Sequence, residues 1–182
     1  MKKSRKQLLF NLCLSGIMAA LYVGFDFLAT NFSAVFGGNI KISLSGLPIM
    51  IVAVFSGPLY AMASGFVGAF IGQLISPYGL TATTLLWVLP AVIRGASMGL
   101  LYLAFKRNEK FGILALESVI SSILVTGANT FVMYADSKIY HYYSFEYVFG
   151  GLIVRIITGV ATAIVFALIL GPIIKALRKI KI

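Results

Sequence analysis

The chain has 182 residues, of which 60% are hydrophobic and 11% are charged. Soluble domains are roughly 45–50% apolar and about 25% charged, so this composition excludes both a water-soluble globular domain and a disordered chain. The formal net charge of +10 does not indicate nucleic-acid binding, because the basic residues gather beside apolar segments. The remaining class is an integral membrane protein, with room for roughly five or six helices of about 20 residues each.

Six apolar segments predict an all-α integral membrane protein, a compact bundle of six transmembrane helices that forms a single domain, 1–182. We expect the spans at 7–29, 42–55, 59–75, 81–105, 111–135 and 148–177. Pro90 lies inside the fourth span and predicts a kink there. The second and third spans are weakly separated, so five spans with one re-entrant piece are the alternative.

The basic residues predict the orientation of the bundle in the membrane. Eleven Lys and Arg side chains fall in the segments 2–6, 106–110 and 175–181, which lie on one side in a six-span topology. The segments on the other side hold only Lys41 and Lys138. The positive-inside rule therefore predicts that both termini are cytoplasmic.

Arg94 lies near the middle of the fourth predicted span, where a charge costs about 2.5–3.5 kcal/mol on insertion scales. Such a group must face the interior of the bundle and find a partner there. Either Glu117 or Asp26 supplies a structural ion pair, or the planar guanidinium binds an anionic group of a ligand. Arg155, two turns into the sixth span, either points into the same cavity or extends to the outer interface.

Other side chains suited to ligand contact are predicted in the outer half of the bundle. They are Thr83, Thr84, Trp87 and Asn129, with Asn39 in the loop 30–41. Asn129 gives the strongest signal among them, because lipid cannot satisfy its amide. For the threonines, bonds to their own helix are the alternative, and for Trp87 it is a position facing lipid. Together with Arg94 these residues predict a pocket, open to the outside, for a small anionic amphiphile.

Small residues recur at helical spacing in the first and third predicted spans. In the first span, Ser15, Gly16, Ala19 and Ala20 form two overlapping small-x-x-x-small pairs, which allow another helix to approach closely. We interpret the glycines of the third span as internal packing positions. For the first span, contact with an external partner helix and packing inside the bundle both stay open.

Signatures of catalysis are lacking in the sequence. It has no phosphate-binding Gly-x-x-x-x-Gly-Lys loop, and His141 and Cys13 are the single histidine and cysteine, so no metal cluster is encoded. The acidic residues are scattered, which leaves no carboxylate pair for acid–base work. We therefore expect no enzymatic activity, no catalytic residue, no metal and no cofactor. A small membrane enzyme or a channel-like protein is the alternative to a binding subunit.

Several features together resemble one known family. They are the basic start, the small residues of the first span, Phe55-Ser56-Gly57-Pro58 before the glycine-spaced third span, and the stretch from Arg94-Gly95 to Gly99-Leu100. In these features, in size and in topology, residues 6–177 resemble the substrate-binding S components of energy-coupling factor (ECF) vitamin transporters. The resemblance implies a six-helix bundle in a bacterial plasma membrane that captures a water-soluble vitamin from outside and tilts during ATP-driven uptake.

The resemblance also implies partners. Besides the vitamin and the lipid bilayer, these are a transmembrane T component and, through it, two ATPase subunits, with no nucleic acid. The family's small-residue motif for T-component contact would fall on Ser15 and Ala19, with Gly16 and Ala20 beside them. The first position is Ser here, where the family usually has Ala.

The choice of vitamin follows from the same resemblance, which points to the folate-like and pantothenate-specific branches. The acid that folate-type members often carry in the third span is missing from Gly65–Ala69, and their Pro-Gly-Phe-Thr element is replaced by Tyr78-Gly79-Leu80-Thr81. Pantothenate needs a cation for its carboxylate and partners for its amide and hydroxyls. We therefore place pantothenate first, folate second, and cobalamin, a queuosine precursor or another vitamin behind them.

In this interpretation each candidate residue has a role. Arg94 clamps the carboxylate, Asn129 bonds the amide or the hydroxyls, and Trp87 packs on the apolar part of the vitamin. The loop 30–41 closes over the site.

Overall fold

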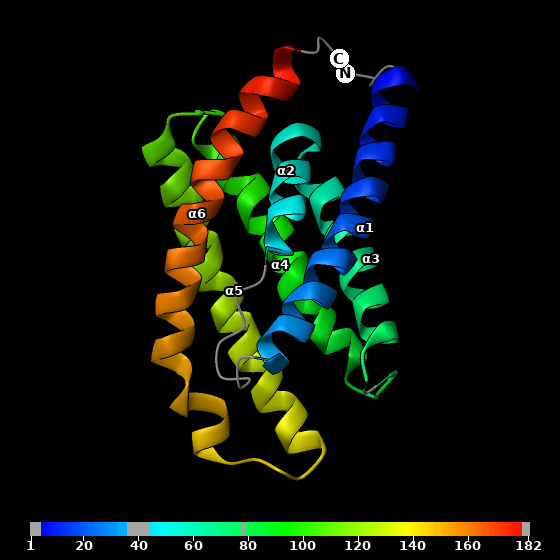
Figure 1. Ribbon diagram of the computed structural model, residues 1–182, viewed down its shortest axis with the longest axis vertical. Coiled ribbons are helices and arrows are strands. Elements are labelled where there is room, and N and C mark those ends of the chain that lie inside the picture. Colours follow the sequence, from blue (N-terminus) through cyan, green and yellow to red (C-terminus); the bar gives the residue numbers. More distant parts are fainter. Residues whose placement is uncertain (1–4, 36–43, 78, 180–182) are drawn as a thin grey trace.

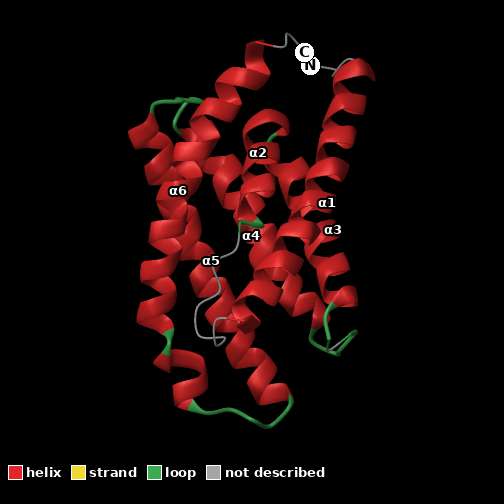
Figure 2. Ribbon diagram, viewed as in Figure 1, coloured by secondary structure: helices red, strands yellow, loops and turns green. Residues whose placement is uncertain are grey.

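The computed structural model describes residues 5–35, 44–77 and 79–179, nearly all of which are helical (Figures 1 and 2). The helices are α1 (Arg5–Val35), α2 (Gly46–Ser56), α3 (Pro58–Ile75), α4 (Thr84–Ala104), α5 (Phe111–Ile139) and α6 (Leu152–Lys179). A π-helical turn, Glu146–Gly150, precedes α6. The predicted all-α membrane bundle is confirmed.

The two ends of the bundle differ in charge. Figure 1 places the start of α1, the end of α6 and the α4–α5 connection at one end, and the α3–α4 and α5–α6 connections at the other. The first end carries the basic residues of 106–110 and Lys175. The positive-inside rule makes this the cytoplasmic end. We refer to it as the inner end and to the opposite one as the outer end.

α2 is too short to cross a bilayer. Its 11 residues extend about 16 Å at 1.5 Å per residue, about half of a hydrocarbon core of ~30 Å. In the described part of the chain, five segments are long and apolar enough to span: Arg5–Asn31, Pro58–Ile75, Thr84–Ala104, Phe111–Ile139 and Glu146–Leu177. This agrees with the five-span alternative. The second expected span, 42–55, corresponds to this short internal helix. Residues 42 and 43 of the expected span lie outside the described part.

α2 fills the inner half of the bundle. It joins α3 at the inner end through Gly57, whose φ of 93° is a conformation that favours glycine. All of its residues except Phe55 are buried, and it contacts α1, α3, α4 and α6. Its side chains form the core with residues such as Met98, Phe166 and Leu170. Because α2 begins only at Gly46, about halfway across, no helix of the described residues fills the corresponding volume of the outer half.

Glycines bring α3 and α4 into close contact. A Cβ on Gly95 would lie 2.6 Å from the backbone of Ala61, and a Cβ on Gly65 would lie 2.7 Å from the carbonyl oxygen of Ala91. The two backbones can approach this closely only because neither glycine carries a side chain. The third-span glycine Gly65 therefore packs inside the bundle.

Polar side chains tie α1 to its neighbours near the inner end. The Ser56 hydroxyl donates to the side-chain oxygen of Asn11 at 3.0 Å, and the Ser64 hydroxyl donates to the carbonyl of Ser15 at 3.0 Å. Ser15 and Ala19 are buried on this face of α1. Gly16 and Ala20 lie about 100° further around the helix and are exposed.

Candidate functional site

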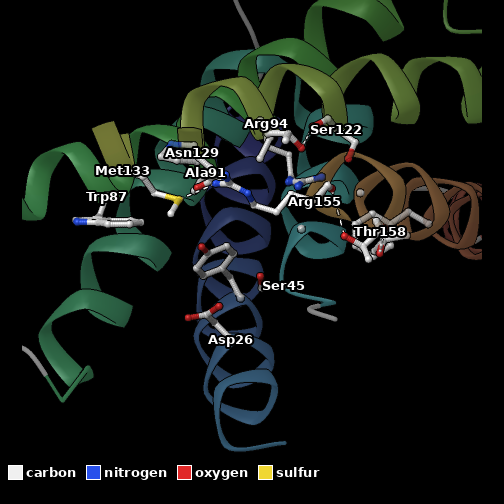
Figure 3. A pocket seen from close by; sticks show the side chains of 18 of the residues that line it. Asp26, Ser45, Trp87, Ala91, Arg94, Ser122, Asn129, Met133, Arg155 and Thr158 are labelled. Atoms are coloured by element: carbon white, nitrogen blue, oxygen red, sulfur yellow. Dashed lines mark hydrogen bonds between the residues drawn. The ribbon is translucent and has the colours of Figure 1, made fainter. Parts of the chain in front are cut away.

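A cavity of about 520 Å³ occupies the volume beyond the start of α2 (Figure 3). This volume is typical of pockets for small ligands, roughly 300–1,000 Å³. All six helices, α1 to α6, and Ser45 before α2 supply its wall. The lining residues are Tyr22, Asp26, Ser45, Gly46, Gln73, Trp87, Pro90, Ala91, Arg94, Ser122, Val125, Thr126, Asn129, Met133, Val154, Arg155, Thr158, Gly159, Thr162 and Phe166.

Arg94 projects from α4 into this cavity (Figure 3). Its side chain passes so close to Gly46 that a Cβ there would lie 2.9 Å from the Arg94 Nε. The guanidinium carbon lies 5.9 Å from the centre of the Phe166 ring, within range of a cation–π contact. The guanidinium thus rests between the first residue of α2 and an aromatic face.

Neither acidic residue considered as an ion-pair partner holds the Arg94 guanidinium. Glu117 is 0% exposed, and within the described residues neither of its carboxylate oxygens has a hydrogen-bond partner. Asp26 lines the same cavity but lies beside α3, where a Cβ on Gly72 would be 3.9 Å from its Oδ2. Across the described ranges, Arg94 forms no ion pair with a carboxylate.

Arg155 also lines the cavity and is held by its surroundings. Its guanidinium donates to the backbone carbonyl of Val148 and contacts the Met133 sulfur at 2.7 Å. Its Nε lies 3.4 Å from the carbonyl of Gly151. With Arg94 and Asp26, the described lining carries two guanidinium groups and one carboxylate, a formal charge of +1.

Neutral polar groups from α5 and α6 complete the wall. Three threonine hydroxyls donate to carbonyls of their own helices: Thr126 to Ser122 at 2.9 Å, Thr158 to Val154 at 2.8 Å and Thr162 to Thr158 at 2.7 Å. A hydroxyl that donates in this way keeps lone pairs that can accept a hydrogen bond from a ligand.

Asn129 is a neutral lining group with unused hydrogen-bonding capacity. It lines the cavity from α5, and its amide makes no hydrogen bond in the part of the chain that the structure describes. An amide offers both donors and an acceptor. The wall can therefore meet a ligand that carries hydroxyl or amide groups beside a negative charge.

The residues predicted from sequence fall into two groups in the structure. Arg94, Asn129, Trp87 and Arg155 come together in the lining of one cavity.

Thr83 and Thr84 are buried outside this lining. The Thr83 hydroxyl donates to the Asp136 carboxylate, and the Thr84 hydroxyl accepts from the backbone N–H of Thr81 at 2.8 Å. These bonds fix the first turn of α4. Asn39 and most of the loop 30–41 lie outside the described residues.

Several lining residues were not predicted. On α6, Arg155, Thr158, Thr162 and Phe166 follow a spacing of three, four and four residues, which places them on one helix face. That periodicity was a usable signal, and only Arg155 was singled out. Tyr22 and Gln73 carry no comparable signal, because one tyrosine or glutamine in an apolar helix is equally compatible with an interfacial position.

A comparison with protein families agrees with this architecture. The family model described as "ECF transporter, substrate-specific component" matches residues 3–177. No curated protein and no solved structure matches the chain. Members of this family are substrate-binding subunits of transporters rather than enzymes, and they associate in the membrane with a T component and ATPases. Because the match covers nearly the whole sequence, the chain belongs to the substrate-specific components of ECF transporters.

Proposed function

We propose that the protein captures a small anionic vitamin on the outer side of the plasma membrane, and that this vitamin is pantothenate. The observation that carries the proposal is the Arg94 guanidinium, which lines a cavity and has no carboxylate partner among the described residues. A charge at this depth needs a counter-charge, because its removal from water is costly. A ligand carboxylate is the group that satisfies it, through two parallel N–H···O bonds.

The start of α2 supports an anion at the same place. Gly46 and Ser45 line the cavity beside Arg94. A helix N-terminus presents backbone N–H groups and the positive end of the helix dipole, so it favours a negative group. Discontinuous helices whose N-termini point at an anionic substrate are a recurrent design in membrane transporters. Arg94 and α2 thus form one electropositive floor.

The charge of the lining favours a monocarboxylate. Pantothenate has one carboxylate, which would neutralise the formal charge of +1 carried by Arg94, Arg155 and Asp26. Folate, with two carboxylates, would leave an excess negative charge in a low-dielectric site. Asn129 and the threonine hydroxyls suit the amide and hydroxyls of pantothenate. Trp87 and Phe166 supply apolar surface for its methyl groups.

We place the contact with the T component on the exposed face of α1, around Gly16 and Ala20. Ser15 and Ala19 are buried, and the Ser15 carbonyl accepts a hydrogen bond from Ser64 of α3, so both positions are occupied by internal packing. The exposed pair has the same spacing of four residues and is open to another helix.

Equilibrium binding of radiolabelled pantothenate to the purified protein tests the proposal. Arg94→Ala should weaken binding at least about thirtyfold, the lower end of the effect of removing one partner of a buried charge pair. Arg94→Lys keeps the charge but loses the planar fork, so its affinity should be intermediate. Pantothenol, which has an alcohol in place of the carboxylate, should bind weakly. Arg94→Ala should change its affinity by less than about threefold.

Two outcomes would contradict the proposal. Unchanged pantothenate binding by Arg94→Ala would show that Arg94 does not bind the carboxylate. Equal losses of affinity for pantothenate and pantothenol would show that the substitution acts through the fold. Competition with unlabelled folate distinguishes the second candidate, because a folate site would bind folate more tightly than pantothenate. Mass spectrometry of the molecule retained through purification identifies the ligand independently.

A further inference from the structure

The Asp136 carboxylate lies at the outer end of the bundle and joins three separate side chains. Asp136 belongs to the last turn of α5 and is 7% exposed. Its Oδ1 accepts hydrogen bonds from the Thr83 hydroxyl and, at 3.2 Å, from the Trp87 indole N–H. Its Oδ2 accepts a hydrogen bond from the Tyr142 hydroxyl. One oxygen therefore binds α4, and the other binds the segment between α5 and α6.

The two oxygens serve different parts of the molecule. Thr83 and Trp87 are four residues apart, so they present their donors on one face of the start of α4. Tyr142 reaches Asp136 because the chain reverses just after α5, where His141 has a φ of 60°. Asp136 thereby links the 140–145 connection to the indole of Trp87.

Further contacts hold the same connection against the helices. The Lys138 ammonium lies 4.0 Å from the centre of the Tyr143 ring, a cation–π contact. The backbone N–H of Ala82 donates to the Tyr140 hydroxyl at 3.1 Å. The connection is thus attached to α5 by Lys138 and to the segment before α4 by Tyr140, with Asp136 between them.

We propose that Asp136 is a positioning residue that fixes Trp87 at the outer part of the cavity and couples it to the 140–145 connection, so that both open together. Trp87 lines the cavity, whereas Asp136 does not. Asp136 therefore acts on a ligand only through Trp87 and the connection. Its effect is on the rates of entry and exit rather than on the contacts that hold the ligand. This inference rests on the proposed function in one respect, namely that the cavity takes up a ligand.

The first test needs no ligand, because Trp87 is the only tryptophan in the chain. Its fluorescence therefore reports one side chain in the full-length protein. Asp136→Ala should shift the emission to longer wavelength and increase acrylamide quenching about threefold, because the indole loses its tether. Asp136→Asn keeps an acceptor oxygen for Thr83 and Trp87, and its amide N–H can donate to the Tyr142 hydroxyl. Its emission should therefore stay near that of the unaltered protein.

Two further variants serve as controls for this measurement. Thr83→Val removes a second donor to the same oxygen without touching the indole and should leave the emission near its original value. Tyr142→Phe removes only the bond to the connection and should match Asp136→Asn. An Asp136→Ala emission spectrum and quenching identical to those of the unaltered protein would overturn the proposal. If Asp136→Ala fails to fold, Trp87→Phe tests the same tether through ligand exchange instead of emission, since its ring cannot donate and it should raise the association and dissociation rates.

The second test measures the exchange of radiolabelled pantothenate. Tyr142→Phe should raise the association and dissociation rates about tenfold, with the Kd changed by less than about threefold, as loss of one buried hydrogen bond would allow. In a Trp87→Phe background, Asp136→Ala should raise the exchange rates no further than Tyr142→Phe does in the same background. A higher Kd with an unchanged association rate would show damage to the site instead and would overturn the proposal. If the unaltered protein binds no pantothenate, the proposed ligand is wrong, while the fluorescence test still decides the role of Asp136.

Discussion

Gly46 and Arg94 are in direct contact at the floor of the cavity. A Cβ at position 46 would lie 2.9 Å from the Nε and 3.0 Å from the Cδ and Cζ of Arg94. The arginine side chain therefore passes over the first residue of α2 at a distance that only glycine allows. The short helix both leaves room for the cavity and sets the direction in which the guanidinium points.

Gly46→Ala should displace the Arg94 guanidinium by a few tenths of an ångström and weaken pantothenate binding about tenfold. Bound geometry of this kind tolerates little misplacement, because the two N–H···O bonds share one plane. Equilibrium binding measures the effect. Gly127→Ala is the matched control, since a Cβ there meets nothing within 4 Å, and its affinity should be unchanged. Equal affinities of the two variants would show that Arg94 adjusts freely.

Glu117 should be dispensable for binding. It is fully buried, and both carboxylate oxygens lack a hydrogen-bond partner within the described part of the chain. Glu117→Gln keeps the shape and removes the ionisable group, so pantothenate affinity should stay within about twofold. Thermal stability should be equal or higher, because burying an unpaired carboxyl is unfavourable. A large loss of affinity would contradict this expectation and would indicate that Glu117 helps to hold the binding site in shape.

The site residues that the sequence predicts are those whose burial in lipid is costly. Arg94 and Asn129 stand out in apolar spans because neither is tolerated without a partner, and both line the cavity. The start of α2 could not be predicted, because Ile42 and Leu44 extend the hydrophobic segment to the amino-terminal side of Gly46. Trp87 was predicted, but its bond to Asp136 joins residues 49 positions apart and follows only from packing.

The roles of the glycines on α3 and α4 also needed the structure. Their spacing indicates close packing, but sequence does not say against which helix. Gly95 faces the backbone of Ala61, whereas Gly16 faces no atom within 4 Å. The same residue type therefore serves internal packing in one helix and leaves an open surface in another.

Gly95→Ala should destabilise the protein by about 1–3 kcal/mol, because a Cβ would lie 2.6 Å from the Ala61 backbone and would force α3 and α4 apart. The melting temperature of the detergent-solubilised protein measures this. Gly112→Ala, where the added Cβ meets nothing within 4 Å, provides the control and should not lower the melting temperature. Identical melting temperatures for both variants would contradict the close approach of the two helices.

Ala20 and Ala19 should respond differently to tryptophan, because Ala20 is exposed on α1 whereas Ala19 is buried. Ala20 is exposed, so Ala20→Trp should leave pantothenate binding by the isolated protein intact. It should abolish uptake in cells that express the T component and ATPases, because the bulky ring prevents close helix contact. Ala19 is 3% exposed and packs inside the bundle, so Ala19→Trp should lower thermal stability and binding together. If Ala20→Trp still supports uptake, the docking face lies elsewhere on the bundle.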